Sequence, residues 1–157
     1  MYVTTIGAVN AYWQDQLLLP LRTQKAKALF FYLMIEWIYY GKTEHRREFL
    51  ADLLWPELDK KAALENLRQT LYIIRRKFKS ISHQEFLISH RFSVNKNKVL
   101  KIQIDLQLLQ SADVFDLIQL PVTKHVPLQD LILYNCEPFY DWLINFQAEV
   151  QQLSIQK

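Results

Sequence analysis

The residues best suited to chemistry are the cations of one segment, KKAALENLRQTLYIIRRKFK at 60–79. This segment holds seven Lys and Arg residues and a single Glu, a net charge of +6. Its apolar residues recur every three or four positions, which is the helical period, so we expect them to form an inward face: Ala63, Leu67, Leu71, Ile74 and Phe78. Cations over the remaining surface of such a helix can neutralise the phosphates of a nucleic acid.

The side of this predicted helix opposite Leu71 is rich in small and amide side chains. A helical wheel places five residues there: Ala62, Asn66, Gln69, Ile73 and Arg76. It places four more along one flank: Arg68, Tyr72, Arg75 and Lys79. Amide groups can pair with base edges on the floor of a DNA groove while cations contact its phosphate walls. A merely solvated helix surface would carry the same residue types, so both interpretations stay open for this helix alone.

The segments on either side supply the other parts of a DNA-binding motif. Before the basic helix, Arg47 to Trp55 predicts a short helix that Pro56 ends, because proline lacks an amide proton and clashes with the preceding turn. A short helix, a loop and a long basic helix make a helix-turn-helix, whose second helix enters the major groove. After the basic helix, FLIS and FSVN around His90 and Arg91 predict a hairpin, or wing, whose basic tip contacts the minor groove or the backbone.

Short strands and one apolar helix are expected in the rest of the N-terminal part. Residues 2–21 predict small strands around a turn, and 99–104 predicts a further strand. Thr23 should cap a strongly apolar helix over 24–40.

Two more helices are predicted after Asp105. One begins near that residue, and the other covers 138–156 and carries an apolar stripe: Phe139, Trp142, Leu143, Phe146 and Val150. The whole pattern predicts an α+β fold in two parts, a domain over 1–104 and a helical segment over 105–157. The chain ends within helical sequence, as a fragment of a longer protein would.

Bulk composition narrows the class of protein. Only two of the 157 residues are Gly, so the sequence has no glycine-rich phosphate-binding loop. A single Cys excludes an internal disulfide and fits a reducing compartment. The longest apolar run, at 28–35, is shorter than the ~20 residues that cross a bilayer, and the N-terminus does not have the pattern of a signal peptide. We therefore expect a soluble cytoplasmic protein with no membrane contact.

Charge is divided unevenly along the chain. Residues 1–104 hold 17 Lys and Arg against 9 Asp and Glu, a net charge of +8. Residues 105–157 hold 2 against 7, a net charge of −5. A polyanion such as nucleic acid would be attracted by the first part and repelled by the second.

No set of residues has the spacing of a catalytic or metal site. Asp52, Glu57 and Asp59 lie close together, but they border a helix end, where capping or solvation explains them better. The four His residues lack metal-ligand spacing, and Cys136 has no activating partner nearby in the sequence. We therefore expect neither an enzyme nor a metal ion nor a cofactor.

The order of strands, two helices, basic helix and hairpin resembles the OmpR-type winged helix. It is most similar to the version in the SARP-like (Streptomyces antibiotic regulatory protein) bacterial activators. Four segments carry the resemblance: RTQKAKALFFYL (22–33), HRREFLADLLWPELD (45–59), AALENLRQTLYIIRRKF (62–78) and IDLQLL (104–109). The segment LILYNCEPFYDWLINFQAEV (131–150) resembles the opening of that family's TPR-like transcriptional activation domain.

This resemblance implies a sequence-specific, double-stranded DNA-binding transcriptional regulator in the bacterial cytoplasm, associated with the nucleoid. It implies a winged helix-turn-helix with a small N-terminal β-sheet, three helices and a C-terminal wing. Binding to direct repeats would bring two copies together as a homodimer, and RNA polymerase would be a further partner.

The same resemblance assigns roles to individual residues. Base contacts would come from four positions: Asn66, Gln69, Thr70 and Ile73, the last through an apolar contact with a thymine methyl. Phosphate contacts would come from another four: Arg47, Lys61, Arg75 and Arg91. Arg76 completes the expected DNA-binding set, because the wheel places it on the same side as the amides.

A protein-interaction module within a larger regulatory protein is the alternative interpretation. The aromatic helix at 24–40 and the stripe around Trp142 would then be the working surfaces, and the basic helix would be only a solvated face. The salt dependence of DNA binding separates the two hypotheses, because phosphate contacts release counterions and apolar contacts do not.

Overall fold

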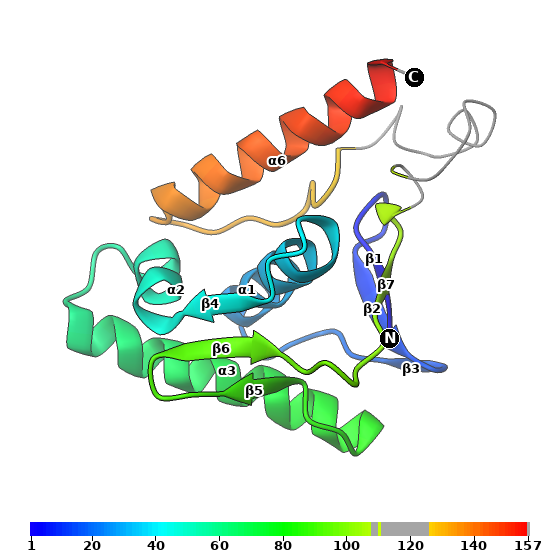
Figure 1. Ribbon diagram of the computed structural model, residues 1–157. Helices are drawn as coiled ribbons and strands as arrows, with labels where there is room; N and C mark the ends of the chain where they lie inside the picture. The colour runs from blue at the N-terminus through cyan, green and yellow to red at the C-terminus, as the bar shows by residue number, and fades with distance from the viewer. Residues whose placement is uncertain (108–109, 111–125, 157) are drawn as a thin grey trace.

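The computed structural model describes residues 1–107, 110 and 126–156 (Figure 1). They form an α+β fold with two small sheets. In chain order the elements are β1 (Tyr2–Thr4), β2 (Asn10–Trp13), β3 (Gln16–Leu17), α1 (Gln24–Met34), the π-helical turn η1 (Ile35–Tyr39), β4 (Glu44–Arg46), α2 (Arg47–Leu54), α3 (Lys60–Ser82), β5 (Leu87–Ser89), β6 (Ser93–Lys96), β7 (Gln103–Ile104) and α6 (Glu137–Gln156). In Figure 1, α1 lies in the middle, with α3 below it and α6 above it.

The N-terminal sheet joins segments about a hundred residues apart. Its order is β3-β2-β1-β7, with β2 antiparallel to β1 and β7 parallel to β1. The Gln103 amide donates to the Met1 carbonyl at 2.8 Å, and the Asp105 amide donates to the Val3 carbonyl at 3.1 Å. The Asp105 carboxylate also accepts bonds from the amide of Thr5 at 2.8 Å and from its hydroxyl at 2.7 Å. These bonds fix β7 beside the first strand of the chain.

From Ala28 onward α1 is buried on all sides, because other elements cover it from two directions. Thr23 caps the helix, as predicted, by accepting a bond from a first-turn amide at 3.0 Å. On one side Phe30 stacks on Phe86, with ring centroids 5.6 Å apart. On the other side Tyr32 meets Trp142 of α6 at 4.7 Å. A helix that is apolar all round needs such cover on both sides.

α2 and α3 form the predicted helix pair. α2 ends at Leu54, and α3 begins after Asp59, whose carboxylate accepts a bond from the Ala62 amide at 2.8 Å. The predicted inward stripe of α3 is confirmed, since each member is at most 3% exposed: Ala63, Leu67, Leu71, Ile74 and Phe78. α3 runs three residues further than predicted, to Ser82, and a left-handed His83 (φ 58) ends it.

β5 and β6 form the predicted hairpin, and a strand that the sequence did not predict joins them. β4 pairs antiparallel with β6, His45 facing Val94, so the sheet order is β4-β6-β5. β4 escaped prediction because it has only three residues, two of them charged, and so lacks an apolar pattern. It ties the hairpin to the start of α2. The strand predicted over 99–104 is confined to its last two residues.

α6 covers the side of α1 that α3 leaves open. The predicted stripe faces inward, with Trp142 half-buried and the other four members buried: Phe139, Leu143, Phe146 and Val150. The helix predicted from Asp105 lies almost entirely outside the described residues. None of the described helices has the length and apolar character needed to cross a membrane.

Candidate nucleic-acid interface

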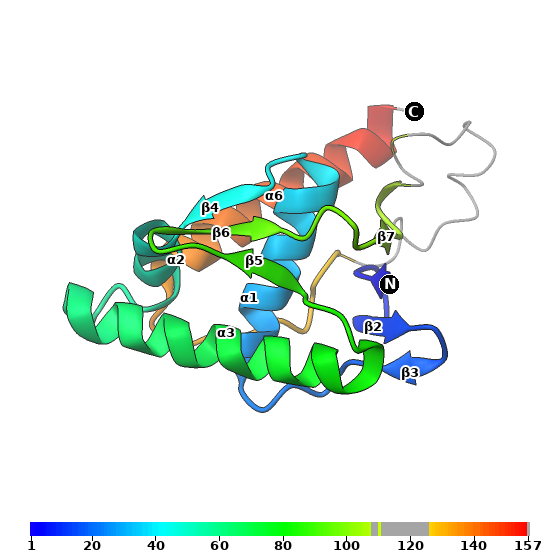
Figure 2. The same ribbon diagram turned by 60° about the horizontal axis from the view of Figure 1, so that its bottom comes forward.

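A groove of 880 Å³ separates α3 from the tip of the β5–β6 hairpin. Figure 2 shows the hairpin running beside α3, with its tip towards the end where α2 and α3 meet. Five cations line this groove: Arg46, Arg47, Lys61, Arg68 and Arg91. The two carboxylates that also line it, Glu48 and Glu65, are each paired, with Lys60 at 2.7 Å and with Arg68 at 2.6 Å. The groove therefore keeps a net positive lining.

A second hollow, of 430 Å³, lies against the C-terminal half of α3. The segment Pro20–Arg22 forms one wall, and α3 forms the other through Tyr72, Ile73, Arg76, Lys77 and Ser80. Three of the residues that line it are cations: Arg22, Arg76 and Lys77. α3 is therefore bordered by cations along both halves of its length.

The open face of α3 is rotated from the one that the sequence wheel predicted. Nine residues of α3 are exposed: Lys60, Lys61, Glu65, Arg68, Gln69, Tyr72, Arg76, Lys79 and Ser80. Asn66 and Ile73, which the wheel placed on the open face, are half-buried, and Ile73 packs partly against the core. Thr70 is 6% exposed, so it is not available for the base contact that we expected from it. The buried arc is wider than the apolar stripe, because Thr70 belongs to it, and the open face is therefore centred nearer Arg68 and Tyr72.

A carboxylate on this open face organises two neighbouring side chains. The Arg68 Nε donates to Glu65 Oε2 at 3.0 Å, and its Nη2 donates to Oε1 at 2.6 Å. Gln69 Nε2 donates to the same Oε1 at 3.1 Å. The bonds from Arg68, and then that from Gln69, lower the pKa of Glu65 to about 2, so the carboxylate is ionised at neutral pH.

Arg47 is turned towards the hairpin rather than away into solvent. Its Nε donates to the His90 carbonyl at 2.9 Å, its Nη2 donates to the Ser89 hydroxyl, and its own amide donates to the Phe92 carbonyl at 2.9 Å. Burial, and then the charge of Arg75, lower the pKa of Arg47. The predicted phosphate contact of Arg47 therefore competes with a structural task, that of fastening the hairpin tip to the start of α2.

Arg75 also has a partner within the protein. Its Nη2 lies 3.3 Å from Glu85 Oε2, while Lys79 Nζ lies 2.8 Å from Glu85 Oε1. The side-chain amide of Asn97 donates to the Glu85 carbonyl at 2.8 Å. The segment that follows the hairpin is therefore bound to the same residue that pairs with Arg75 and Lys79. Lys79, and then Arg75, lower the pKa of Glu85 by hydrogen bonding to its ionised form.

The remaining predicted cations, Lys61, Arg76 and Arg91, are exposed. At the hairpin tip the Arg91 guanidinium lies 5.1 Å from the centre of the Phe92 ring, which is 68% exposed. Sequence reasoning missed Arg22 and Arg46. The available signal for Arg46 was its position directly before the predicted short helix.

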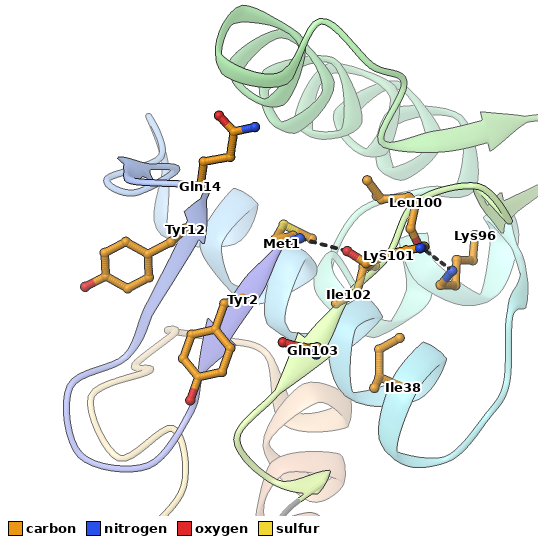
Figure 3. A pocket seen from close by; sticks show the side chains of 10 residues that line it. All are labelled: Met1, Tyr2, Tyr12, Gln14, Ile38, Lys96, Leu100, Lys101, Ile102 and Gln103. Carbon is orange, nitrogen blue, oxygen red and sulfur yellow. Dashed lines mark hydrogen bonds between the residues drawn. The ribbon is translucent and has the colours of Figure 1, made fainter.

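A further hollow, of 510 Å³, lies at the N-terminal sheet and is shown in Figure 3. Tyr2, Tyr12, Lys96 and Lys101 are among the residues that line it, and the Met1 amino group donates to the Lys101 carbonyl at 2.7 Å. The Lys96 ammonium is also engaged, by the Leu100 carbonyl at 3.0 Å. Among the described residues, no group of three or more His, Cys, Asp or Glu side chains is placed to hold a metal ion.

No family model matches this chain, and neither a curated protein nor a solved structure matches it.

Proposed function

We propose that this protein is a sequence-specific, double-stranded DNA-binding transcriptional regulator that uses a winged helix-turn-helix. α3 lies in the major groove, and the hairpin tip near Arg91 contacts the backbone or the minor groove. The single observation that carries this proposal is the cation-lined groove between α3 and the hairpin.

The geometry of a duplex explains why a groove in this position supports DNA binding. One phosphodiester strand always runs between a major groove and the adjacent minor groove. If α3 lies in the major groove and the hairpin tip reaches over the minor groove, that strand passes between them. Arg46, Lys61 and Arg91 then face it from the end of β4, α3 and the hairpin respectively.

The other elements fit the same scheme. β4 pairs with the hairpin and leads directly into α2, so the wing and the helix pair are held together. In this scheme Arg22 and Arg76, which line the second hollow, would lie near the opposite wall of the major groove. Gln69, exposed on the open face, and the half-buried Asn66 supply amides for base contacts.

The two surfaces that the interaction-module alternative would use lie largely against each other within the protein. The aromatic side of α1 and the Trp142 stripe of α6 pack against each other, as Tyr32 and Trp142 show. Trp142 Nε1 also donates to the Glu36 carboxylate at 2.9 Å. Tyr32 is therefore buried and Trp142 half-buried, so these parts of the two surfaces are occupied within the protein.

A salt titration of binding to a labelled duplex, followed by fluorescence anisotropy, tests the proposal. Each phosphate contact contributes about −0.9 to the slope of log K against log salt, so contacts from three to five of the groove cations predict a slope of roughly −3 to −5. Lys61→Ala and Arg91→Ala should each reduce the steepness by about 0.9. Lys101→Ala, an exposed cation beside the N-terminal sheet, is the matched control and should change nothing. A wild-type slope near zero would refute the proposal.

Selection of bound sequences from random duplexes tests sequence preference. Gln69→Ala should weaken binding to the selected site by about 1–3 kcal/mol and leave binding to random DNA unchanged. Two copies of the motif at a fixed spacing would support a homodimer on repeat sites. Equal losses on selected and random DNA would contradict the role given to Gln69.

A further inference from the structure

We propose that Glu65 is a positioning residue that holds the Arg68 guanidinium ready to bind a guanine, so that the preferred DNA site contains a guanine facing Arg68. The inference rests on the proposed function and deepens it, because it names a base rather than only a duplex.

The argument begins with which edge of the guanidinium is occupied. Glu65 accepts from Nε and Nη2 of Arg68, at 3.0 and 2.6 Å, and so binds one side edge of the planar group. The end edge, formed by Nη1 and the second proton of Nη2, donates to no other group in the described part of the chain. That edge carries two parallel N–H donors in a fixed plane.

Only one base matches two parallel donors in the major groove. Guanine presents two acceptors, O6 and N7, whereas adenine presents an acceptor beside a donor. Thymine presents one acceptor beside a methyl group, and cytosine presents a donor. A guanidinium with its end edge free therefore prefers guanine, and its preference is sharper when the side chain is already oriented.

The position of the pair on α3 suits this role. Glu65 and Arg68 lie one helical turn apart on the open face and both line the groove beside the hairpin. Gln69 donates one of its amide protons to the same carboxylate, so its carbonyl and second proton stay available. One carboxylate thus orients two potential base-reading side chains at once.

The alternative role of an exposed ion pair at this spacing is to stabilise its own helix. The two roles differ in what they change. A helix-supporting pair affects helix stability and is indifferent to base identity, whereas a positioning pair alters base preference. Both side chains are solvent-exposed, so we expect their substitution to leave the fold intact. Differences in base preference between the variants can then be assigned to the pair itself.

The experiment is selection from random duplexes with four proteins: wild type, Arg68→Ala, Glu65→Gln and Glu137→Gln. Glu137 is an exposed carboxylate at the start of α6, so Glu137→Gln controls for the loss of one negative charge. Wild type and Glu137→Gln should select a motif with a fixed guanine. Arg68→Ala should lose that preference by about 5- to 150-fold. Glu65→Gln should lower it several-fold without weakening overall affinity, because it removes a negative charge from the surface that meets DNA.

A second duplex in which 7-deazaguanine replaces the fixed guanine lacks the N7 acceptor. This replacement should weaken DNA binding by the wild-type protein and leave DNA binding by Arg68→Ala unchanged. The inference is overturned, with DNA binding intact, if wild type selects a motif whose guanine Arg68→Ala retains, or if Glu65→Gln retains the full preference. If wild type enriches no sequence at all, the proposed function itself fails.

Discussion

α3 and α6 cover opposite sides of α1, and they differ in both charge and packing. α3 carries a net charge of +6, whereas α6, EPFYDWLINFQAEVQQLSIQ, holds three acidic residues and not one Lys or Arg. The inner stripe of α6 carries three aromatic residues, which are joined to α1 and η1 by ring contacts and by the hydrogen bond from Trp142 to Glu36. The Tyr40 hydroxyl, just after η1, also donates to Glu149 of α6. The exposed face of α3 keeps its polar side chains in solvent beside a groove.

This difference shows that two amphipathic helices on one core can serve separate purposes. A polyanion can approach the α3 side and is repelled from the α6 side, so the charge division along the chain becomes a division between two faces of the molecule. The aromatic residues of α6 act within the protein. Tyr72 of α3 and Phe92 of the hairpin tip are exposed.

Matched aromatic deletions on the two faces should give the largest effects. Phe146 is 1% exposed at the α6 interface, so Phe146→Ala should lower the free energy of unfolding by about 3–5 kcal/mol. Tyr72 is 58% exposed on α3, so Tyr72→Ala should change stability by less than about 0.5 kcal/mol while weakening DNA binding. Urea denaturation and anisotropy measure the two quantities. Similar stability losses for both variants would erase the distinction between the faces.

Arg47 provides a sharper test within the basic face. Arg47→Lys keeps the charge but cannot reproduce the forked bonds to Ser89 and His90, so the hairpin should open more easily by about 1.5–3 kcal/mol. In Arg47→Lys the hydrogen-exchange rates of the β5 and β6 amides should rise, and DNA binding should weaken. The neighbouring Arg46→Lys is the control and should leave both unchanged. If Arg47→Lys behaves like Arg46→Lys, Arg47 acts as a simple cation and its bonds to the tip are incidental.

A smaller effect concerns pH at the α6 side. Burial raises the pKa of Glu36 above its ordinary value of 4.5, against the opposing influence of the Trp142 hydrogen bond. The folded state therefore binds this proton more tightly than the unfolded chain does. The resulting stabilisation is present below pH 4.5 and is lost as pH rises through the folded-state pKa.

Glu36→Gln stays neutral, so its stability relative to wild type should rise as pH increases from about 4 to about 8. Urea denaturation of both proteins across that range measures the difference. A difference that does not vary with pH would show that burial of Glu36 is not linked to its ionisation.

Sequence periodicity was sufficient for α3, for its buried stripe and for the hairpin, because each depends on residues close together in the chain. It failed where distant segments decide the outcome. Thr70 is polar, as residues of an exposed helix face usually are, but the inward-packing arc of α3 is wide enough to include it. β4 exists because β6 offers it a partner, and its own three residues carry no strand pattern.

The candidate site shows the same limit. The cations were identified from their types, but their partners were not. Arg47 and Arg75 engage Ser89 and Glu85, which lie 42 and 10 residues further along the chain. The Glu65 pair spans only one turn and follows a common helical spacing, yet a lone acid in a basic helix was treated only as a reduction in charge.

The parallel pairing of β1 with β7 has a mechanical consequence. A force that pulls the start of β1 and the end of β7 in opposite directions would load this pair in shear, so that its hydrogen bonds resist together instead of breaking one after another. The Asp105 carboxylate, bound to Thr5, adds to that resistance at the point where the chain leaves the sheet. Tension applied at the end of β7 would therefore be resisted by this sheet.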